Sequence, residues 1–431
     1  MIKVVLEARL SHSRLVPAGR GFQFALLTAA VTAALYARTA VNPVQENMRI
    51  GLGLTDNEVA LLQGLAPAMA AVIASIPVGL IVDRQSRRVL LILLCGLGAV
   101  GTLLTALASS FGLLLAARSL TGLAHAATSI TAFSLLADLY QPSERGRTGM
   151  VLILGQSAGM AGAFALGGTL LSVAQTGADS WRWTLLWMGA PLVLIFFLLL
   201  RLSEPPRKNV VHQNKSLRET FRELWGYRSI VMPLLLGMVM AEIGSCAALV
   251  WAAPMLERRF GVAPDRIGII MSSIVLVGTV LGSVGGGLIA DRAQRNGGPR
   301  RTLLLLSYLA LLSAPAGLFA AAGRIAQTGL LLATFLMLVS AIIVMVLALA
   351  TIVVPGEVHG VCLASMIGAN TLFGVALAPL LVSVLSNAMG GANMLGSALA
   401  LVCAPTGLFG ALFFTLGRRQ VTRGDWCAQD A

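Results

Sequence analysis

The chain has 431 residues, of which 57% are apolar and only 11% are charged, and 46 glycines come on top of the apolar share. In soluble domains about a quarter of the residues are charged and the apolar share is lower. A water-soluble globule of this length cannot bury so much apolar surface, so the composition indicates that lipid is the solvent. The net charge of +13 does not indicate nucleic-acid binding, because the basic residues lie in short loops between apolar runs, as in membrane proteins.

The apolar runs predict twelve spanning helices, since about 20 apolar residues cross the hydrocarbon core. The runs lie near 22–50, 57–82, 89–109, 112–138, 147–173, 183–201, 229–255, 267–290, 302–322, 326–352, 360–388 and 393–416. The basic stretch before the first run looks like the start of a signal peptide, but eleven further runs follow, so we expect the first helix to be retained. The predicted fold is an all-α integral membrane protein with two six-helix bundles, 1–201 and 229–431, joined by a cytoplasmic linker, 202–228.

The distribution of Lys and Arg predicts the orientation. With the N-terminus inside, the cytoplasmic segments hold 23 of these residues and the outer loops hold 6. Positive residues gather on the cytoplasmic side of membrane proteins. We therefore expect a multi-pass protein of the plasma (inner) membrane with both termini in the cytoplasm.

The linker has the pattern of a short amphipathic helix. Ser216 and Glu219 can form a capping box, and four apolar residues then share one helical face: Leu217, Phe221, Leu224 and Trp225. This favours a helix on the inner membrane surface. A disordered linker is the alternative.

Nothing in the sequence indicates an enzyme. The five cysteines lie far apart, without metal or disulfide spacing. No nucleotide-binding loop, metal cluster or nucleophile–base pair stands out. We expect no cofactor, and ATP-driven pumping is disfavoured.

A short segment recurs in the two halves, each time after the second helix of its half. The residues that carry the repeat are Gly79, Asp83, Arg84, Arg87 and Arg88 in the first half and Gly287, Asp291 and Arg292 in the second. A weaker echo links 142–147 with 355–360. Two parallel halves of six helices are a known transporter architecture.

The first of these segments resembles the signature loop motif of the major facilitator superfamily. Arg118-x-x-x-Gly122 is similar to its motif in the fourth span. The fifth span resembles the glycine-rich fifth helix of the superfamily through Gly155, Gly159, Gly162, Gly167 and Gly168. The resemblance covers nearly the whole chain and implies a secondary transporter that works by alternating access.

Within the superfamily the first half is most similar to the Spinster-like group. The similar segments are 52–65, 83–87, 134–138, 181–183 and 204–207. Two departures bear on mechanism. The group usually carries an acidic residue where this chain has Ala37, and a glutamate where it has His125. In the Spinster-like group those acids are thought to carry protons. The two departures therefore concern proton coupling and the expectation of a lipid-like substrate.

The aspartates of the repeated loop are candidates for gating. Asp83 and Asp291 lie where a carboxylate can meet helix N-termini or arginines across the seam between the halves. Making and breaking such contacts can bias which side of the cavity is open. The alternative is that these loops only enforce topology, which fits their arginines well.

A polar stripe interrupts the first span, with Arg38, Asn42, Gln45 and Arg49 at i, i+4, i+7 and i+11. Such a stripe must face protein or a water-filled cavity, since an arginine at the bilayer centre costs at least about 2.5–3.5 kcal/mol. One interpretation makes Arg38 the anchor of a substrate anion. The other is a structural pair with Glu46, Glu242 or a backbone carbonyl.

Two further polar residues lie inside apolar helices. His125 follows Arg118 by two helical turns and can titrate near neutral pH, or it can be a neutral, hydrogen-bonded histidine. Glu242 is the only acid in the apolar body of its helix. It can carry a coupling proton or be a permanent partner of Arg38. Because helices one, four and seven line the cavity in the superfamily, the resemblance implies that Arg38, His125 and Glu242 meet near the bilayer midplane.

These observations together predict a proton-coupled secondary transporter for a small organic, amphipathic and anionic solute. A lipid-like substrate is within this class, and we expect a monomer in the bilayer. The alternatives are a multidrug efflux pump that exchanges its substrate for protons, and a membrane receptor or sensor without transport.

Overall fold

The computed structural model describes residues 19–174, 177, 179–205 and 217–422. Within these residues the regular structure is entirely helical. The first six spans are α2 (Arg20–Thr39) with η1 (Asn42–Val44) and α3 (Gln45–Gly51), then α4 (Asp56–Ala60) with η2 (Leu61–Leu65) and α5 (Ala66–Arg84), α6 (Arg87–Leu107), α7 (Phe111–Leu139), α8 (Pro142–Val173) and α9 (Ser180–Leu199).

The second half begins with a short helix, α10 (Leu217–Gly226). Its long elements are α11 (Arg228–Phe260), α12 (Pro264–Ala316) with η3 (Gly317–Ala321), α13 (Ile325–Val353), η4 (Gly356–Val358), α14 (His359–Ala369) with η5 (Asn370–Val375) and α15 (Ala378–Ala388), and η6 (Ala392–Met394) with α16 (Leu395–Thr422). These bounds agree with the predicted runs to within a few residues, except that α12 covers two of the predicted runs, 267–290 and 302–322.

Element α12 contains two spans, although its helical turns run on for 53 residues. Gly297 and Gly298 have non-helical backbone angles, and Gly298 has φ +61° and ψ −155°. That positive φ suits glycine, which has no Cβ, and Pro299 follows. The chain reverses here, so eleven long apolar stretches make twelve spans, and the prediction of twelve is confirmed.

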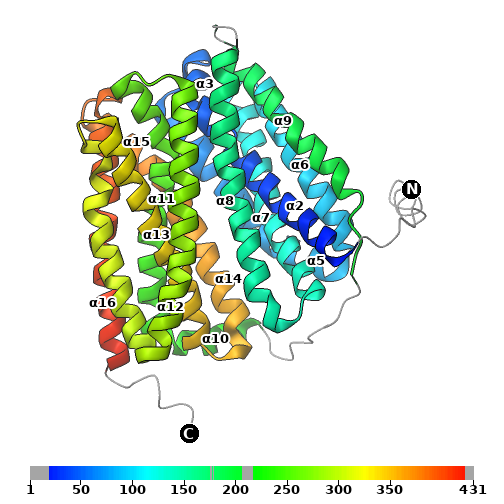
Figure 1. The fold of residues 1–431 in the computed structure, drawn as a ribbon, viewed down its shortest axis with the longest axis vertical. Coiled ribbons are helices and arrows are strands. Elements are labelled where there is room, and N and C mark those ends of the chain that lie inside the picture. The colour runs from blue at the N-terminus through cyan, green and yellow to red at the C-terminus, as the bar shows by residue number, and fades with distance from the viewer. Residues whose placement is uncertain (1–18, 175–176, 178, 206–216, 423–431) are drawn as a thin grey trace.

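The spans form two bundles that lie side by side (Figure 1). The halves touch where glycines let two backbones approach, because a larger residue would not fit. A Cβ added at Gly168 in α8 would lie 2.5 Å from the Pro264 carbonyl oxygen and 2.7 Å from the Gly268 Cα of α12. A Cβ added at Gly64 in η2 would lie 2.8 Å from the carbonyl oxygen of Ala376.

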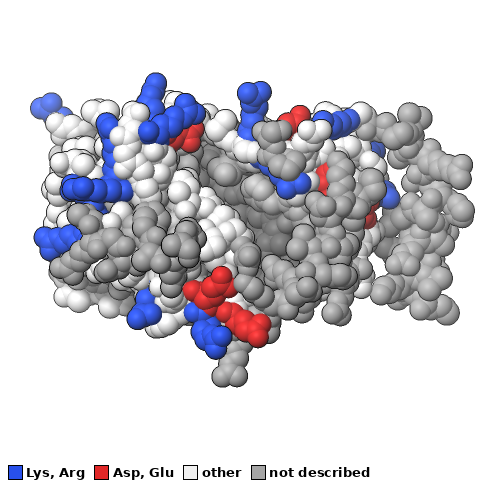
Figure 2. Space-filling model, turned by 90° about the horizontal axis from the view of Figure 1, so that it is seen from below, with Lys and Arg blue, Asp and Glu red and all other residues white. Residues whose placement is uncertain are grey.

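Two ends of this pair of bundles differ. At the end where α3 and α15 lie, which we call the closed end, the halves are in contact (Figure 1). The other end carries α10 and is the open end: Figure 2 shows the protein hollowed there between the halves, with Arg side chains and fewer acidic ones around the rim.

The amphipathic helix expected in the linker is present as α10. Leu224 is buried in the apolar core of the second half, whereas Phe221 and Trp225 are 52% and 63% exposed. The alternative of a disordered linker does not hold for 217–226. Ser216 of the expected capping box lies outside the described residues.

Three spans are not continuous α-helices. The first span changes to a 3₁₀ turn at Asn42–Val44, where Pro43 lacks the amide that a continuous helix would need. The second and eleventh spans each contain one π-helical turn, η2 and η5. These two turns touch each other across the halves.

Candidate functional site

Arg38, His125 and Glu242 lie around one point between the halves. They come from α2, α7 and α11, and the positive charge of Arg38 acts on both of the other groups. Each of the three keeps part of its surface exposed although it lies in the apolar body of its helix. A polar group at that depth faces protein or water rather than lipid. The three groups therefore face protein or water between the bundles rather than lipid.

The Arg38 guanidinium group is not held by another described side chain. Among the described residues no carboxylate lies within 4.0 Å of it, and its side chain donates no hydrogen bond to them. The permanent ion pair with Glu46 or Glu242 that the sequence left open is thus not formed in this state. Glu46 pairs elsewhere, with Arg49 and Arg258.

Glu242 is held by the π-helical turn η5 instead. The Asn370 side chain lies close to Glu242, since a Cβ added at Gly374 would be 3.4 Å from Asn370 Oδ1 and 2.8 Å from the Glu242 side chain. Gly374 gives it room, since a Cβ at that position would lie 2.8 Å from both Cβ and Cγ of Glu242. Glu242, which lies on the seventh span, is therefore positioned by residues of the eleventh span.

A buried amide network supports the site from the first half. Gln63 of η2 donates from Nε2 to Asn42 Oδ1 at 3.0 Å and to Gln45 Oε1 at 2.8 Å. Arg118 is 1% exposed and donates from Nη2 to the Arg38 carbonyl oxygen at 2.5 Å and to Gln63 Oε1 at 3.2 Å. Asn42 in turn donates to the carbonyl oxygen of Leu249 in α11 at 3.1 Å. Arg118 thus holds the backbone at Arg38, and Asn42 connects the first span to the second half.

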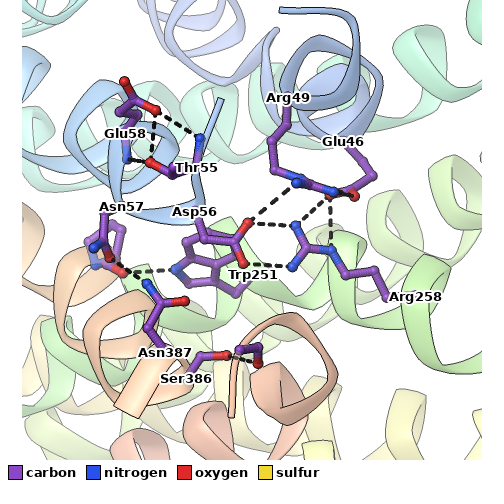
Figure 3. Close-up of polar contacts among 12 residues, drawn as sticks. Glu46, Arg49, Thr55, Asp56, Asn57, Glu58, Trp251, Arg258, Ser386 and Asn387 are labelled. Atoms are coloured by element: carbon purple, nitrogen blue, oxygen red, sulfur yellow. Dashed lines mark hydrogen bonds and ion pairs between the residues drawn. The ribbon is translucent and has the colours of Figure 1, made fainter. Parts of the chain in front are cut away.

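A cluster of four charged residues joins the halves at the closed end (Figure 3). Arg258, at the end of α11, donates from Nη1 and Nη2 to Asp56 at 2.8 Å each. It also donates to Glu46 Oε2 at 2.7 Å from Nη2 and at 3.1 Å from Nε. Arg49 pairs with Glu46 at 2.6 Å and with Asp56 at 3.6 Å. We call Glu46, Arg49, Asp56 and Arg258 the closed-end cluster.

The closed-end cluster is electrically balanced and mostly buried. The side chains of Glu46, Asp56 and Arg258 are 7%, 6% and 14% exposed. Beside it Asn387 of α15 donates to Asn57 Oδ1 at 3.2 Å, again across the halves. Sequence analysis named Arg49 only in the polar stripe of the first span and Glu46 only as a possible partner of Arg38. Arg258, which pairs with Glu46 and Asp56, lies more than 200 residues away from both, and no local pattern marks these pairs.

The loop motif of the first half builds a second ion network, at the open end. Arg87 is 4% exposed and pairs with Asp138 at the end of α7 at 2.5 Å. Glu204 accepts hydrogen bonds from the Arg87 amide, at 2.9 Å, and from the Ser86 hydroxyl group. A carboxylate at this position stabilises the start of α6. Arg88 donates to the Leu200 carbonyl oxygen at 2.9 Å. These arginines tie spans three, four and six together.

The gating contact expected of the aspartates remains a prediction. The side chains of Asp83 and Arg84 lie outside the described part of the structure. A Cβ added at Gly79 would have no neighbouring atom within 4 Å. Asp291 and Arg292 are exposed near the open end. No ion pair with another described residue is formed by either of these two.

The described residues contain no group of three or more His, Cys, Asp or Glu side chains placed to hold a metal ion. The site therefore consists of side-chain charges, amides and a space between two bundles.

A family model described as Major Facilitator Superfamily matches residues 27–372, most of the chain. The chain belongs to the major facilitator superfamily.

Solved structures show the same fold. A bacterial homologue of the human lysosomal transporter Spinster, inward-facing and unoccupied, has a TM-score of 0.79 at 21% identity, covering 94% of this chain and 98% of that one. Its occupied form gives 0.80 at 20% identity with the same coverage. A D-xylose–proton symporter gives 0.70 at 16% identity, covering 91% and 97%. None of the curated proteins matches the sequence. The chain is thus a transporter of this superfamily rather than an enzyme.

Proposed function

We propose that this major facilitator transporter moves a small, amphipathic organic anion by alternating access, with Arg38 as the anchor of the anion and Glu242 as the carrier of a coupling proton. The observation that carries the proposal is the Arg38 guanidinium group. It is partly exposed between the halves and has no carboxylate among the described residues within 4.0 Å. A buried cation without a counter-ion favours an anionic ligand.

The neighbours of Arg38 suit an anion with an apolar body. Its guanidinium group can bind a carboxylate or phosphate with two parallel hydrogen bonds. The surrounding spans offer few charges, and α7 and α11 are apolar over most of their length. This combination supports an amphipathic solute, including a lipid-like one.

Glu242 supports proton coupling because it is not consumed by an ion pair. A carboxyl group that is held by an amide and partly open to the cavity can release a proton in one state and take it up in the other. The charge of Arg38 acts on it. An arriving anion would screen that charge, which links anion binding to protonation.

The contacts also suggest which state this is. The closed-end cluster seals one end and the other end is hollowed (Figures 2 and 3). We assign the open end to the cytoplasm, with both termini, because arginines gather at its rim. The structure then represents an inward-open state of a transporter in the plasma (inner) membrane.

Reconstitution of the purified protein tests this proposal. A thermal-shift screen with organic anions identifies a ligand, since a compound that binds only the folded protein raises the melting temperature. Arg38→Gln is expected to abolish that shift, while Arg324→Gln, at an exposed loop position, keeps it. Glu242→Gln is expected to abolish uptake driven by a pH gradient and to keep counterflow exchange.

Two results would contradict the proposal. Normal pH-driven uptake by Glu242→Gln would remove the proton role, and an unchanged ligand shift in Arg38→Gln would remove the anion anchor. A broad response to unrelated cations and neutral compounds would favour the multidrug efflux alternative. Ligand binding without exchange in liposomes would favour a receptor.

A further inference from the structure

The π-helical turn η5 presents one polar side chain whose bonding is incomplete. Asn370 is 8% exposed, and its Oδ1 has no hydrogen-bond donor among the described residues. Its amide lies beside the Glu242 carboxyl group. A buried acceptor without a hydrogen-bond donor is unfavourable. Such an atom persists where a ligand supplies the missing donor.

The local backbone explains why this side chain lies beside Glu242. A π-helical turn inserts one extra residue into the helix and changes the direction of the side chains that follow, and such turns are frequent at functional sites. Here the turn runs over Asn370–Val375. A Cβ at Gly374 would be 3.4 Å from Asn370 Oδ1 and 2.8 Å from Glu242. The amide and the acid therefore share one small space that only a glycine leaves open.

We propose that Asn370 is a specificity-determining residue of the central site, whose Oδ1 accepts a hydrogen bond from a hydroxyl or amine group on the substrate anion. This inference rests on the proposed function and narrows its substrate class. The anion binds Arg38 of the first half and its donor group binds Asn370 of the second half. One solute then contacts both bundles, which is what alternating access requires of a substrate that triggers closure.

Asn370 also positions Glu242 through its amide. Loss of the side chain would therefore change two things: the recognition of a donor group, and the pH dependence of coupling through Glu242. Thr371 offers a matched control in the same turn. Its hydroxyl group is already bonded to the Ile367 carbonyl oxygen at 2.9 Å.

The experiment uses the purified full-length protein and three probes: decanoate, its hydroxylated counterparts and its aminated counterparts. For the wild type and Thr371→Val, a hydroxylated or aminated probe is expected to bind about tenfold more tightly than decanoate, as one hydrogen bond to a buried acceptor allows. Asn370→Leu should bind all probes alike. Asn370→Asp keeps an acceptor oxygen and should restore the preference.

A second measurement separates recognition from folding. Each variant is checked for an unchanged gel-filtration profile, and the pH profile of counterflow is measured. Asn370→Leu is expected to displace that profile and Thr371→Val to leave it in place. If all probes bind the wild type equally, or if Asn370→Leu still prefers the hydroxylated and aminated probes, this inference is wrong. Either result leaves the proposed role of Arg38 in binding the anion unaffected. Failure of every anion to bind the wild type overturns the proposed function and this inference with it.

Discussion

Arg258 is the one residue through which the second half enters the closed-end cluster. Replacing it by methionine removes four hydrogen bonds to Glu46 and Asp56 at 2.7–3.1 Å and keeps the apolar stem. Arg49 stays with both acids in the first half. The two acids then share one arginine, and the main loss is the attraction between the halves.

The size of that loss follows from the burial of the pair. Close interfacial charge pairs have coupling energies of about 1.5–7 kcal/mol. Because Arg258 keeps 14% of its side chain exposed and Arg49 still neutralises one acid, we expect the low end, about 1.5–3 kcal/mol. That shift moves the equilibrium between the inward-open and outward-open states about 10- to 100-fold toward outward-open.

Spin labels on cysteines at positions 50 and 394 measure this shift. Ile50 and Met394 are exposed, and they lie on α3 and η6 in the two halves. On a cysteine-free background, double electron–electron resonance should show a longer-distance population in Arg258→Met. Arg259→Met is the matched control, because Arg259 has no ion pair with any described residue and contacts the Ala320 carbonyl group of its own half. Identical distance distributions in the two variants would refute the reasoning.

Three further outcomes are expected. Arg87→Met removes the 2.5 Å ion pair with the partly buried Asp138 carboxylate and should lower the stability of the first half by about 3–5 kcal/mol in thermal melts, whereas a melt like that of the exposed Arg292→Met would contradict this. Gly168→Ala pushes against Pro264 and Gly268 and should destabilise by about 1–3 kcal/mol, with Gly112→Ala, which has open space, as control. Asp83→Asn should slow transport while ligand affinity stays near the wild-type value, and a wild-type transport rate would defeat the gating role.

The sequence by itself determined the membrane class, the number of spans and their approximate bounds. Hydropathy is a property of consecutive residues, and each span must satisfy lipid along its own length. The same local rule identified Arg38, His125 and Glu242, because a charged or polar group in an apolar helix stands out wherever the helix packs. The motif arginines were also visible, although their partners Asp138 and Glu204 were not assigned to them.

Only the tertiary structure decided which faces meet. The pairing of Arg258 with Glu46 and Asp56 depends on how two bundles close at one end, and nothing near any of these residues in the chain encodes it. The break of the first span at Pro43 and the π-helical turns also appear only when the helices are packed. Gln63 and Asn370 looked like ordinary polar residues in apolar runs. The π-helical turns η2 and η5 place both side chains where the two halves meet, and that is a property of packed helices rather than of sequence spacing.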